Sequence, residues 1–308
     1  MLSSPRVVVL YERGTGDPRA FGSAYLRLIR PLSHPGAGLD VTFATAPPET
    51  GCEVCIIDRL WYPGLGPDGA RELLAGLRAA GARIIHALDD NLLDVDAAAA
   101  GLPAHAAEVA RILAAGADGV LVTTTTLAER LGGVNPNVVV LPNALDERLL
   151  VPRAPAEPRT PFGHRPLTIG YMGTRTHEAD LRLVVPALQA AARHHKDLAI
   201  EVVGGVGDET AAAMLDGLPW RRVRPVSGPV YPLFMVWWTS EVEWDVALAP
   251  LASTPLNACK SDIKILDYAA IGAATLASNC AAYVKNVASP PGAVLVDNED
   301  GAWEAALL

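Results

Sequence analysis

The segment NACKSDIKILD, residues 257–267, gathers polar side chains at helical spacing. Lys260 and Lys264 lie four positions apart, and Asp267 follows three positions later, so a helix would project all three side chains together. Ser261 is a favourable N-cap for this helix. Its first turn would offer N–H groups and the positive end of the helix dipole to an anion, most naturally a phosphate. The spacing predicts a phosphate site, with a solvent-exposed face and an ordinary ion pair as the alternative.

The use of lysine rather than arginine in this segment supports the predicted phosphate site. Of the 25 basic residues only four are lysines, and two of these are Lys260 and Lys264. Lysine is a compact point charge, whereas arginine is a planar fork. Because arginine is the usual cation of this chain, we expect a lysine here to be needed for its own geometry.

Other polar residues follow apolar runs. Asp89 and Asp90 come directly after RIIHAL, where they could serve an acceptor hydroxyl or cap the following segment. His177 and Asp180 are three positions apart at the start of a helical stretch. They could lie near a ligand, or Thr176 could simply cap that helix. His86 lies inside an apolar run, which favours a core histidine.

Two glycine-rich loops also follow apolar runs. Gly14 and Gly16 begin a G-x-G-x-x-G pattern whose third position is Arg19, and in the loop at 204–207 the third position is Thr210. The ribose-binding acid of a dinucleotide site is also missing after the second run. These departures argue against NAD and FAD. The loops could let the backbone approach another ligand, or they could be tight turns.

Cys52 and Cys55 have the spacing of redox or metal motifs. They lie in GCEVCIID, which predicts a strand, and residues three apart in a strand point to opposite faces. No second cysteine pair has zinc-like spacing. We therefore predict two core thiols without a disulfide between them.

Composition limits the partners. The net charge is −9, and the basic residues are scattered except for Arg221, Arg222 and Arg224. A nucleic-acid binder normally has a basic stripe, so we expect no nucleic-acid partner. A small anionic substrate needs only a local basic pocket.

Membrane and export signals are weak. The longest uncharged stretch, Tyr268–Val284, has 17 residues, fewer than the about 20 apolar residues of a spanning helix. The start MLSSPRVVVL lacks the apolar run of a signal peptide. We expect a cytoplasmic protein with at most peripheral contact at the inner face of a membrane. The aromatic run Phe234, Trp237, Trp238 and Trp244 favours packing against a sheet over membrane contact.

The order of elements predicts an α/β fold. Continuous apolar runs, typical of buried parallel strands, alternate with helical stretches. Strands are expected at 6–10, 41–44, 54–58, 83–88, 119–123 and 137–141, and again at 167–172, 198–204, 222–226, 245–251, 274–278 and 293–297; the main helices are expected at 21–32, 67–82, 103–117 and 178–194.

A proline-rich stretch divides the two series. Residues 152–166 contain five prolines and predict a semi-rigid linker. The sequence thus predicts two Rossmann-like domains, residues 1–151 and 167–308. Ligands of such sheets bind at the carboxyl ends of the strands, so we expect a site in a cleft between the domains.

Most of the chain resembles a known enzyme family. The segment GPVYPLFMVWW…AIGAATLASNCAAY, with IGYMGTRTHEADL and EVVGGVGDE, is similar to the donor-binding half of bacterial GT-B glycosyltransferases of family 4 type, also called glycosyl transferases group 1. RIIHALDDN and LVTTTTLAERLGGVNPNVVVLPNALD resemble the corresponding acceptor-side pieces. The resemblance is strong from Leu167 to Asp297 and weaker before Arg83. It implies a GT-B fold, with two facing Rossmann-like domains.

The family signature is a pair of glutamates eight positions apart. The second glutamate binds the ribose hydroxyls of the donor, and it falls on Asp267. The first contacts the donor sugar, and it falls on Cys259, whose thiol cannot accept hydroxyl hydrogen bonds as a carboxylate does. Asn257 or a backbone group could substitute for it.

The resemblance also assigns the remaining site residues. It places Arg175 and Lys264 against the diphosphate, so that fixed cations favour departure of the leaving group. No cofactor is expected beyond the nucleotide diphosphate sugar as co-substrate, and no metal. The implied catalytic residues are Arg175, Lys264 and Asp90; the implied donor-binding residues are Gly173, Thr174, Gly204, Gly205, Tyr231, Asn257, Lys260, Ser261 and Asp267; the implied acceptor-side residues are Arg13, Gly14 and Asp89.

The predicted function is a retaining glycosyltransferase. It would move a sugar from a nucleotide diphosphate sugar to a hydroxyl of a carbohydrate or lipid-linked acceptor, in surface polysaccharide or glycan assembly. The alternatives are a sugar-nucleotide epimerase of the same fold and a non-catalytic nucleotide-sugar-binding partner subunit.

Overall fold

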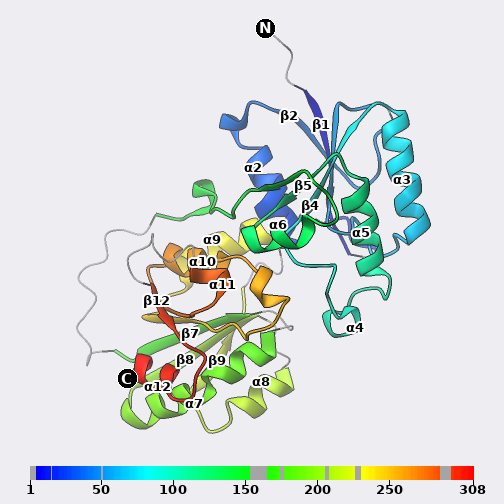
Figure 1. Cartoon of the computed structure of the whole chain (residues 1–308). Helices are drawn as coiled ribbons and strands as arrows, with labels where there is room; N and C mark the ends of the chain where they lie inside the picture. Colours follow the sequence, from blue (N-terminus) through cyan, green and yellow to red (C-terminus); the bar gives the residue numbers. More distant parts are fainter. Residues whose placement is uncertain are drawn as a thin grey trace. The chain divides into compact units, whose positions relative to one another are not determined.

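The computed structural model describes residues 5–14, 16–49, 51–152, 165–173, 177–204, 208–225, 230–284 and 293–308 (Figure 1). The chain forms two compact units. Unit 1 comprises Met1–Asp146 together with Cys259–Ser261, and unit 2 comprises Glu147–Ala258 together with Asp262–Leu308. The division falls before the predicted boundary at residue 151, and residues 153–164 of the predicted linker lie outside the described residues.

Unit 1 contains a six-stranded parallel sheet of order β2-β1-β3-β4-β5-β6. Its strands are β1 Arg6–Leu10, β2 Asp40–Ala44, β3 Val54–Asp58, β4 Arg83–Leu88, β5 Gly119–Val122 and β6 Val138–Val140. Its helices are α1 Gly22–Ala24, α2 Arg30–Leu32, α3 Pro67–Ala79, α4 Ala97–Ala100, α5 Ala106–Gly116 and α6 Thr125–Leu131, with a π-helical turn at Tyr25–Ile29 and a 3-10 turn at Pro35–Ala37.

Both faces of this sheet are covered. Val8 and Leu10 of β1 belong to one apolar core with the leucines of α3 and α5. Val7 and Val9 belong to a second core with Leu28. Successive strand residues point to opposite faces, so a strand with a core on each face must be apolar throughout. This explains why the strands are continuous apolar runs, as predicted.

Unit 2 repeats the arrangement, with a parallel sheet of order β12-β11-β10-β7-β8-β9. Its strands are β7 Leu167–Gly173, β8 Leu198–Gly204, β9 Trp220–Val223, β10 Val246–Ala249, β11 Ala274–Ser278 and β12 Ala293–Val296. Its helices are α7 Glu178–His194, α8 Asp208–Met214, α9 Tyr231–Glu241, α10 Ile263–Ala270, α11 Ala281–Val284 and α12 Ala302–Leu307, with 3-10 turns at Glu147–Leu149 and Asn257–Cys259.

The two sheets confirm the predicted α/β class and most predicted strands. The exception in position is β9, which was predicted at 222–226 and lies two to three residues earlier.

The predicted start of the helix after residue 260 is wrong. Helix α10 begins at Ile263, and Asp262 occupies the N-cap position without a side-chain capping bond. Lys260 therefore precedes the helix, and it belongs to unit 1, whereas Lys264 belongs to unit 2. The shared helical face predicted for Lys260, Lys264 and Asp267 does not form; only the last two lie on α10.

Contrary to the prediction, Cys52 and Cys55 do not lie on opposite faces of one strand. Strand β3 begins at Val54, so Cys52 lies outside it. Cys52 and Cys55 belong to the same apolar core rather than to opposite faces, and both are free thiols. Burial, with the neighbouring Cys52, raises the pKa of Cys55 to about 12. Both side chains are therefore core thiols, as predicted, although the reason given from strand geometry is wrong.

The aromatic run packs into unit 2. Trp238 and Trp244 are fully buried and meet edge to face at 4.9 Å between ring centroids. Their indole N–H groups donate to the Asp267 carbonyl and to the Glu201 carboxylate, both at 2.8 Å. Packing against the sheet is confirmed for these two residues. No helix among the described residues is long and apolar enough to span a bilayer.

Trp244 also dictates a glycine in β7, which leads to a stability prediction. A Cβ at Gly170 would lie 1.8 Å from Cδ2 of Trp244. The indole is fully buried and cannot move aside, so Gly170→Ala should destabilise unit 2 by about 1–3 kcal/mol or more. Thermal unfolding followed by circular dichroism measures this loss.

The matched control is Gly76→Ala in α3, where nothing lies within 4 Å of the added Cβ. This change should raise stability by up to about 1 kcal/mol, because alanine is the better helix former. Equal effects of the two substitutions would contradict the packing of Trp244.

Candidate functional site

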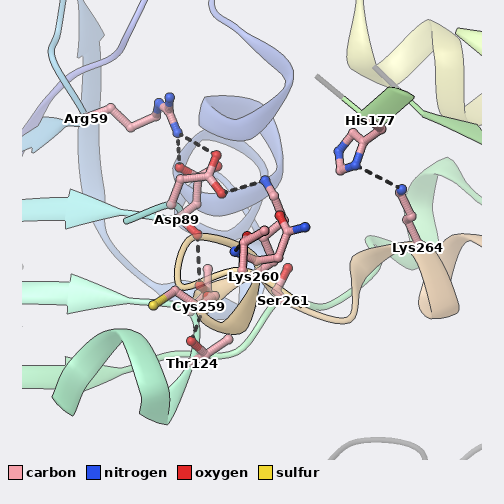
Figure 2. Close-up of polar contacts among 12 residues, drawn as sticks. Arg59, Asp89, Thr124, His177, Cys259, Lys260, Ser261 and Lys264 are labelled. Atoms are coloured by element: carbon pink, nitrogen blue, oxygen red, sulfur yellow. Dashed lines mark hydrogen bonds and ion pairs between the residues drawn. The ribbon is translucent and has the colours of Figure 1, made fainter. Parts of the chain in front are cut away.

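Unit 2 brings a histidine, a carboxylate and a lysine together beyond the carboxyl end of β7. Figure 2 shows the histidine and the lysine, His177 and Lys264. His177 Nδ1 lies 2.5 Å from Asp180 Oδ2, and Lys264 Nζ lies 3.5 Å from the same ring nitrogen. All three side chains are buried, with at most 9% of each residue exposed. The cluster joins the first turn of α7 to α10.

Neighbouring groups fix the members of this cluster. Asp180 Oδ1 accepts from the Ala252 amide at 2.7 Å and from Asn257 Nδ2 at 3.4 Å. Tyr171 donates its hydroxyl to the His177 carbonyl at 3.0 Å, and the Lys264 ammonium lies 5.5 Å from the Tyr171 ring centroid. A buried lysine held beside a histidine at the carboxyl end of a parallel sheet is suited to binding an anion.

Asp267 lies one turn after Lys264 on α10 and is 5% exposed. Among the described residues its Oδ1 atom has no hydrogen-bond partner. Burial alone raises the pKa of this carboxyl from 3.8 to about 8. A buried oxygen without a donor is costly, and hydroxyl groups of a ligand are donors that would satisfy it.

The two glycines that end β7 and β8 have a structural reason. Gly204 has φ +92°, and a Cβ there would lie 2.3 Å from the Gly173 carbonyl oxygen. Only glycine tolerates this close approach and this conformation. The predicted site residues Thr174, Arg175 and Gly205, with Thr176, lie outside the described residues. Tyr231 is the first residue of α9.

Unit 1 gathers a second charged cluster around Arg59 (Figure 2). Its guanidinium bonds Glu12 Oε2 at 2.6 Å, contacts the Asp89 carboxylate and lies 3.3 Å from Asp90 Oδ2. Lys260 Nζ donates to Asp90 Oδ1 at 3.0 Å. The predicted pair Asp89 and Asp90 therefore bonds to cations rather than capping the segment that follows.

The same contacts set the charge of Asp90. Burial would raise the pKa of this carboxyl, but Lys260 and Arg59 outweigh burial and lower it to about 2. Asp58 shows the opposite case. It is 2% exposed and accepts from the Glu12 amide at 2.9 Å, and burial together with the nearby Glu12 raises its pKa to about 8.

No motif in the sequence predicted Glu12, Asp58 or Arg59 as site residues. Each lies at or just beyond the end of β1 or β3, so the rule that selected Asp89 after β4 would have found them. Arg59 also has φ +47°, a strained conformation for a residue other than glycine. His86 Nε2 lies 2.8 Å from the Arg59 carbonyl oxygen, and burial lowers the His86 pKa to about 4, as expected of a core histidine.

The remaining predicted residues of unit 1 lie as follows. Arg13 donates its backbone N–H to the Trp61 carbonyl at 3.2 Å, and its guanidinium lies 5.9 Å from the Tyr62 ring centroid. Gly14 faces the Phe21 ring, with 3.7 Å between Phe21 Cε1 and an added Cβ.

Residues 259–261 are also part of unit 1. Cys259 is 2% exposed in the apolar core, and its carbonyl accepts from Thr124 Oγ1 at 2.9 Å. Ser261 Oγ accepts from Asn143 Nδ2 at 2.8 Å. The predicted donor-binding set is thus divided: Lys260 and Ser261 belong to unit 1, and Asn257 and Asp267 belong to unit 2 with the predicted catalytic residue Lys264.

The described side chains contain no group of three His, Cys, Asp or Glu residues that could hold a metal ion. The nearest to such a group is Asp89 with Asp90, and Arg59 already contacts both carboxylates.

Comparison with known proteins places this geometry in a fold family. No protein-family model matches the sequence, and no curated protein matches it. Solved structures do match. A UDP-forming α,α-trehalose-phosphate synthase from Burkholderia xenovorans has a TM-score of 0.59 and 13% identity, over 99% of this chain and 90% of the other. The lipopolysaccharide outer core galactosyltransferase WaaB has a TM-score of 0.56 and 11% identity, over 98% and 88%.

The chain has a GT-B fold. A third similar structure, a variant of TarM from S. aureus solved with fondaparinux, α-GlcNAc-glycerol and UDP, has a TM-score of 0.53 and 10% identity over 82% of this chain. The present chain spans about half of TarM, with 48% covered. At these identities the similarity establishes the two Rossmann-like domains of a GT-B protein, and the chemistry must be argued from the residues.

The raised pKa of Asp267 predicts how stability depends on pH. Between about pH 4 and pH 8 the folded chain keeps this proton and the unfolded chain releases it, so stability falls as pH rises through that window. Asp267→Asn has no carboxyl at this position, so this part of the loss of stability with rising pH disappears. The melting temperature should therefore fall less between pH 5 and pH 8 in the variant than in the wild type.

Asp216→Asn, at an exposed position of the same unit, is the control and should follow the wild type. Asp58 retains its raised pKa in all three proteins. Its contribution to the pH dependence of stability is therefore the same in each and does not affect the comparison. Parallel pH profiles for wild type and Asp267→Asn would show that Asp267 is ionised in the folded chain.

Proposed function

We propose that the chain is a glycosyltransferase that binds a nucleotide diphosphate sugar through unit 2. The observation that carries this proposal is the buried Asp267 carboxyl, whose Oδ1 has no partner among the described residues. Vicinal ribose hydroxyls would donate to this carboxylate and restore its ionised form, since hydrogen bonds to the charged form lower a pKa.

The neighbouring cluster suits the diphosphate of the same ligand. Lys264 is 9% exposed and lies one turn before Asp267, so one ligand could contact both side chains. As the glycosidic bond breaks, negative charge grows on the departing nucleoside diphosphate. A fixed cation favours that state over the ground state. Arg175 would add a second cation in this proposal.

On the acceptor side, Asp90 orients the hydroxyl of the acceptor. A carboxyl with a pKa of about 2 is too weak a base to hold the hydroxyl proton at neutral pH. It can still accept a hydrogen bond from that hydroxyl. Asp89, Arg13 and Gly14 would complete this side, and Arg59 positions both aspartates through the contacts described above.

The finer assignments rest on the family resemblance. They are a retaining reaction without a metal ion, membership of family 4, a carbohydrate or lipid-linked acceptor, and a role in surface polysaccharide or glycan assembly in the cytoplasm. The UDP in the TarM structure and the UDP-forming synthase support a nucleotide-sugar donor.

A second candidate function is binding of a nucleotide sugar without transfer. Cys259 stands where the resembling family has the glutamate that contacts the donor sugar. Here it is 2% exposed and packs among the apolar residues of unit 1. Asn257, the suggested substitute, uses its amide N–H groups on the Ala252 carbonyl at 2.9 Å and on Asp180. A chain without that carboxylate could retain binding and lose catalysis.

The donor site predicts different effects of substitutions at Lys264 and Asp267. At pH 8.5, where the carboxyl is largely ionised, Asp267→Asn should weaken the nucleoside and the nucleoside diphosphate alike, by about ten- to hundredfold. Lys264→Met should weaken the diphosphate by about the same factor and leave the nucleoside nearly unchanged. Calorimetric titration with uridine, guanosine and adenosine and their diphosphates measures both.

Lys196→Met and Asp216→Asn, at exposed positions of unit 2, are the matched controls. If neither site substitution changes affinity by more than about threefold in a folded protein, Lys264 and Asp267 are structural and the donor binds elsewhere.

Catalysis and metal dependence can be tested in one assay. With excess EDTA and no acceptor, the chain should slowly release nucleoside diphosphate from UDP-, GDP- or ADP-sugars, because protein cations stabilise the leaving group. Loss of release in EDTA, restored by magnesium or manganese, would show that Asp89 and Asp90 bind a metal. Tight donor binding without any release, with or without metal, would favour the second candidate.

A further inference from the structure

Unit 2 contains a hollow of about 780 Å³ that the proposed donor site does not use. It lies where β7, β8 and β9 begin, next to the last turn of α9. Its lining includes Arg165, Thr168, Glu201, Arg221, Trp237 and Glu243. His177 and Asp267 lie toward the opposite, carboxyl end of this sheet. Along β8 the two ends are separated by on the order of 15 Å.

The strand register shows which face of the sheet borders the hollow. Gly170, Glu201 and Arg221 are aligned on neighbouring strands and therefore share a face. Trp244 covers this face over Gly170. Beyond Trp244 the sheet ends at β9, an edge strand of four residues, and the hollow lies between this edge and the end of α9.

Two arginines of the hollow, Arg221 and Arg165, are held by buried carboxylates. Arg221 bonds Glu201 Oε1 through Nε at 3.0 Å and Nη2 at 2.5 Å. Glu201 is itself fixed by Trp244. Arg165 contacts both oxygens of Asp245. The Arg221 side chain is nevertheless 74% exposed, so its planar guanidinium is oriented in advance and accessible to a ligand.

The charges of the hollow are balanced. The lining carries Arg165, Arg221, Arg222 and Arg224 against Glu201, Glu241 and Glu243, and Asp245 binds Arg165 as a fourth acid. A strongly charged ligand would meet as many repelling as attracting groups. The hollow instead offers many donors and acceptors to a neutral, highly hydroxylated molecule.

The hollow also has an aromatic side chain in its lining. Trp237 lines the hollow, with its ring centroid 5.7 Å from that of Phe234. A flat aromatic surface beside fixed planar donors and exposed carboxylates suits a pyranose ring, which has an apolar C–H face and hydroxyl groups around its edge. The volume lies within the range of small-molecule sites.

We propose that this hollow is a second carbohydrate-binding site, for one or two neutral sugar units, separate from the donor site. The sugar ring packs on Trp237, and its hydroxyls bond the guanidinium of Arg221 and the carboxylates of Glu241 and Glu243. These contacts bind a carbohydrate and take no part in a reaction. The proposal for this site therefore does not depend on the proposed donor chemistry.

The test uses saturation-transfer NMR and calorimetry on the full chain with lactose, maltose, cellobiose and N,N′-diacetylchitobiose, and with citrate as an anionic probe. At least one disaccharide should bind, and saturating UDP, GDP and ADP should not displace it. Trp237→Ala should weaken binding by about tenfold or more, and Trp237→Tyr should retain it within about threefold. Leu233→Ala, at an exposed position of α9 outside the lining, is the control.

The proposal would be overturned by no binding of any of the four sugars, by equal binding in wild type and Trp237→Ala, or by displacement of the sugar by the nucleotides. Binding of citrate in place of the sugars would also contradict it. If Trp237→Ala does not fold, Glu243→Gln replaces it, with the same expected loss. Loss of nucleotide binding in Asp267→Asn with sugar binding intact would show that the two sites are independent.

Discussion

The packing of Trp244 on Gly170 is the contact on which both sites of unit 2 depend. From this position the indole N–H holds Glu201, which in turn orients Arg221 at the hollow. The edge of the same ring meets Trp238, whose N–H bonds the Asp267 carbonyl and so fixes α10. One glycine in β7 thus allows one tryptophan to position groups at two ends of the sheet.

Unit 1 depends in a similar way on one residue, although the interaction is electrostatic. The Arg59 guanidinium contacts three carboxylates that follow two different strands, β1 and β4, and its carbonyl is fixed by His86. Its positive φ shows that the backbone accepts strain to bring the side chain there. Without this cation, the carboxylates gathered at the end of the sheet would repel one another.

Features that depend on the pattern of apolar residues along a segment could be predicted from the sequence. Features that depend on the exact residue at which a helix or strand begins could not. Continuous apolar runs predicted the strands because each strand must meet a core on both faces. The N-cap of α10 is Asp262, one residue later than expected, and Lys260 lies outside the helix and therefore off the predicted helical face. The start of β3 at Val54 likewise placed Cys52 and Cys55 in one core. Arg59 was not predicted as a site residue because the carboxylates that it contacts are distant from it in the sequence.

The two units together show how the surroundings decide what an aspartate can do. Asp58 and Asp267 are buried with pKa values of about 8, whereas Asp90, which is partly exposed and lies beside Lys260 and Arg59, has a pKa of about 2. Burial favours the protonated form of the first two carboxyls, and additional hydrogen-bond donors, such as ligand hydroxyls, would lower their pKa values. The third is ionised at any physiological pH. The protein thus keeps a fixed charge on Asp90 in unit 1, whereas in the proposed donor site of unit 2 the charge of Asp267 would depend on the bound ligand.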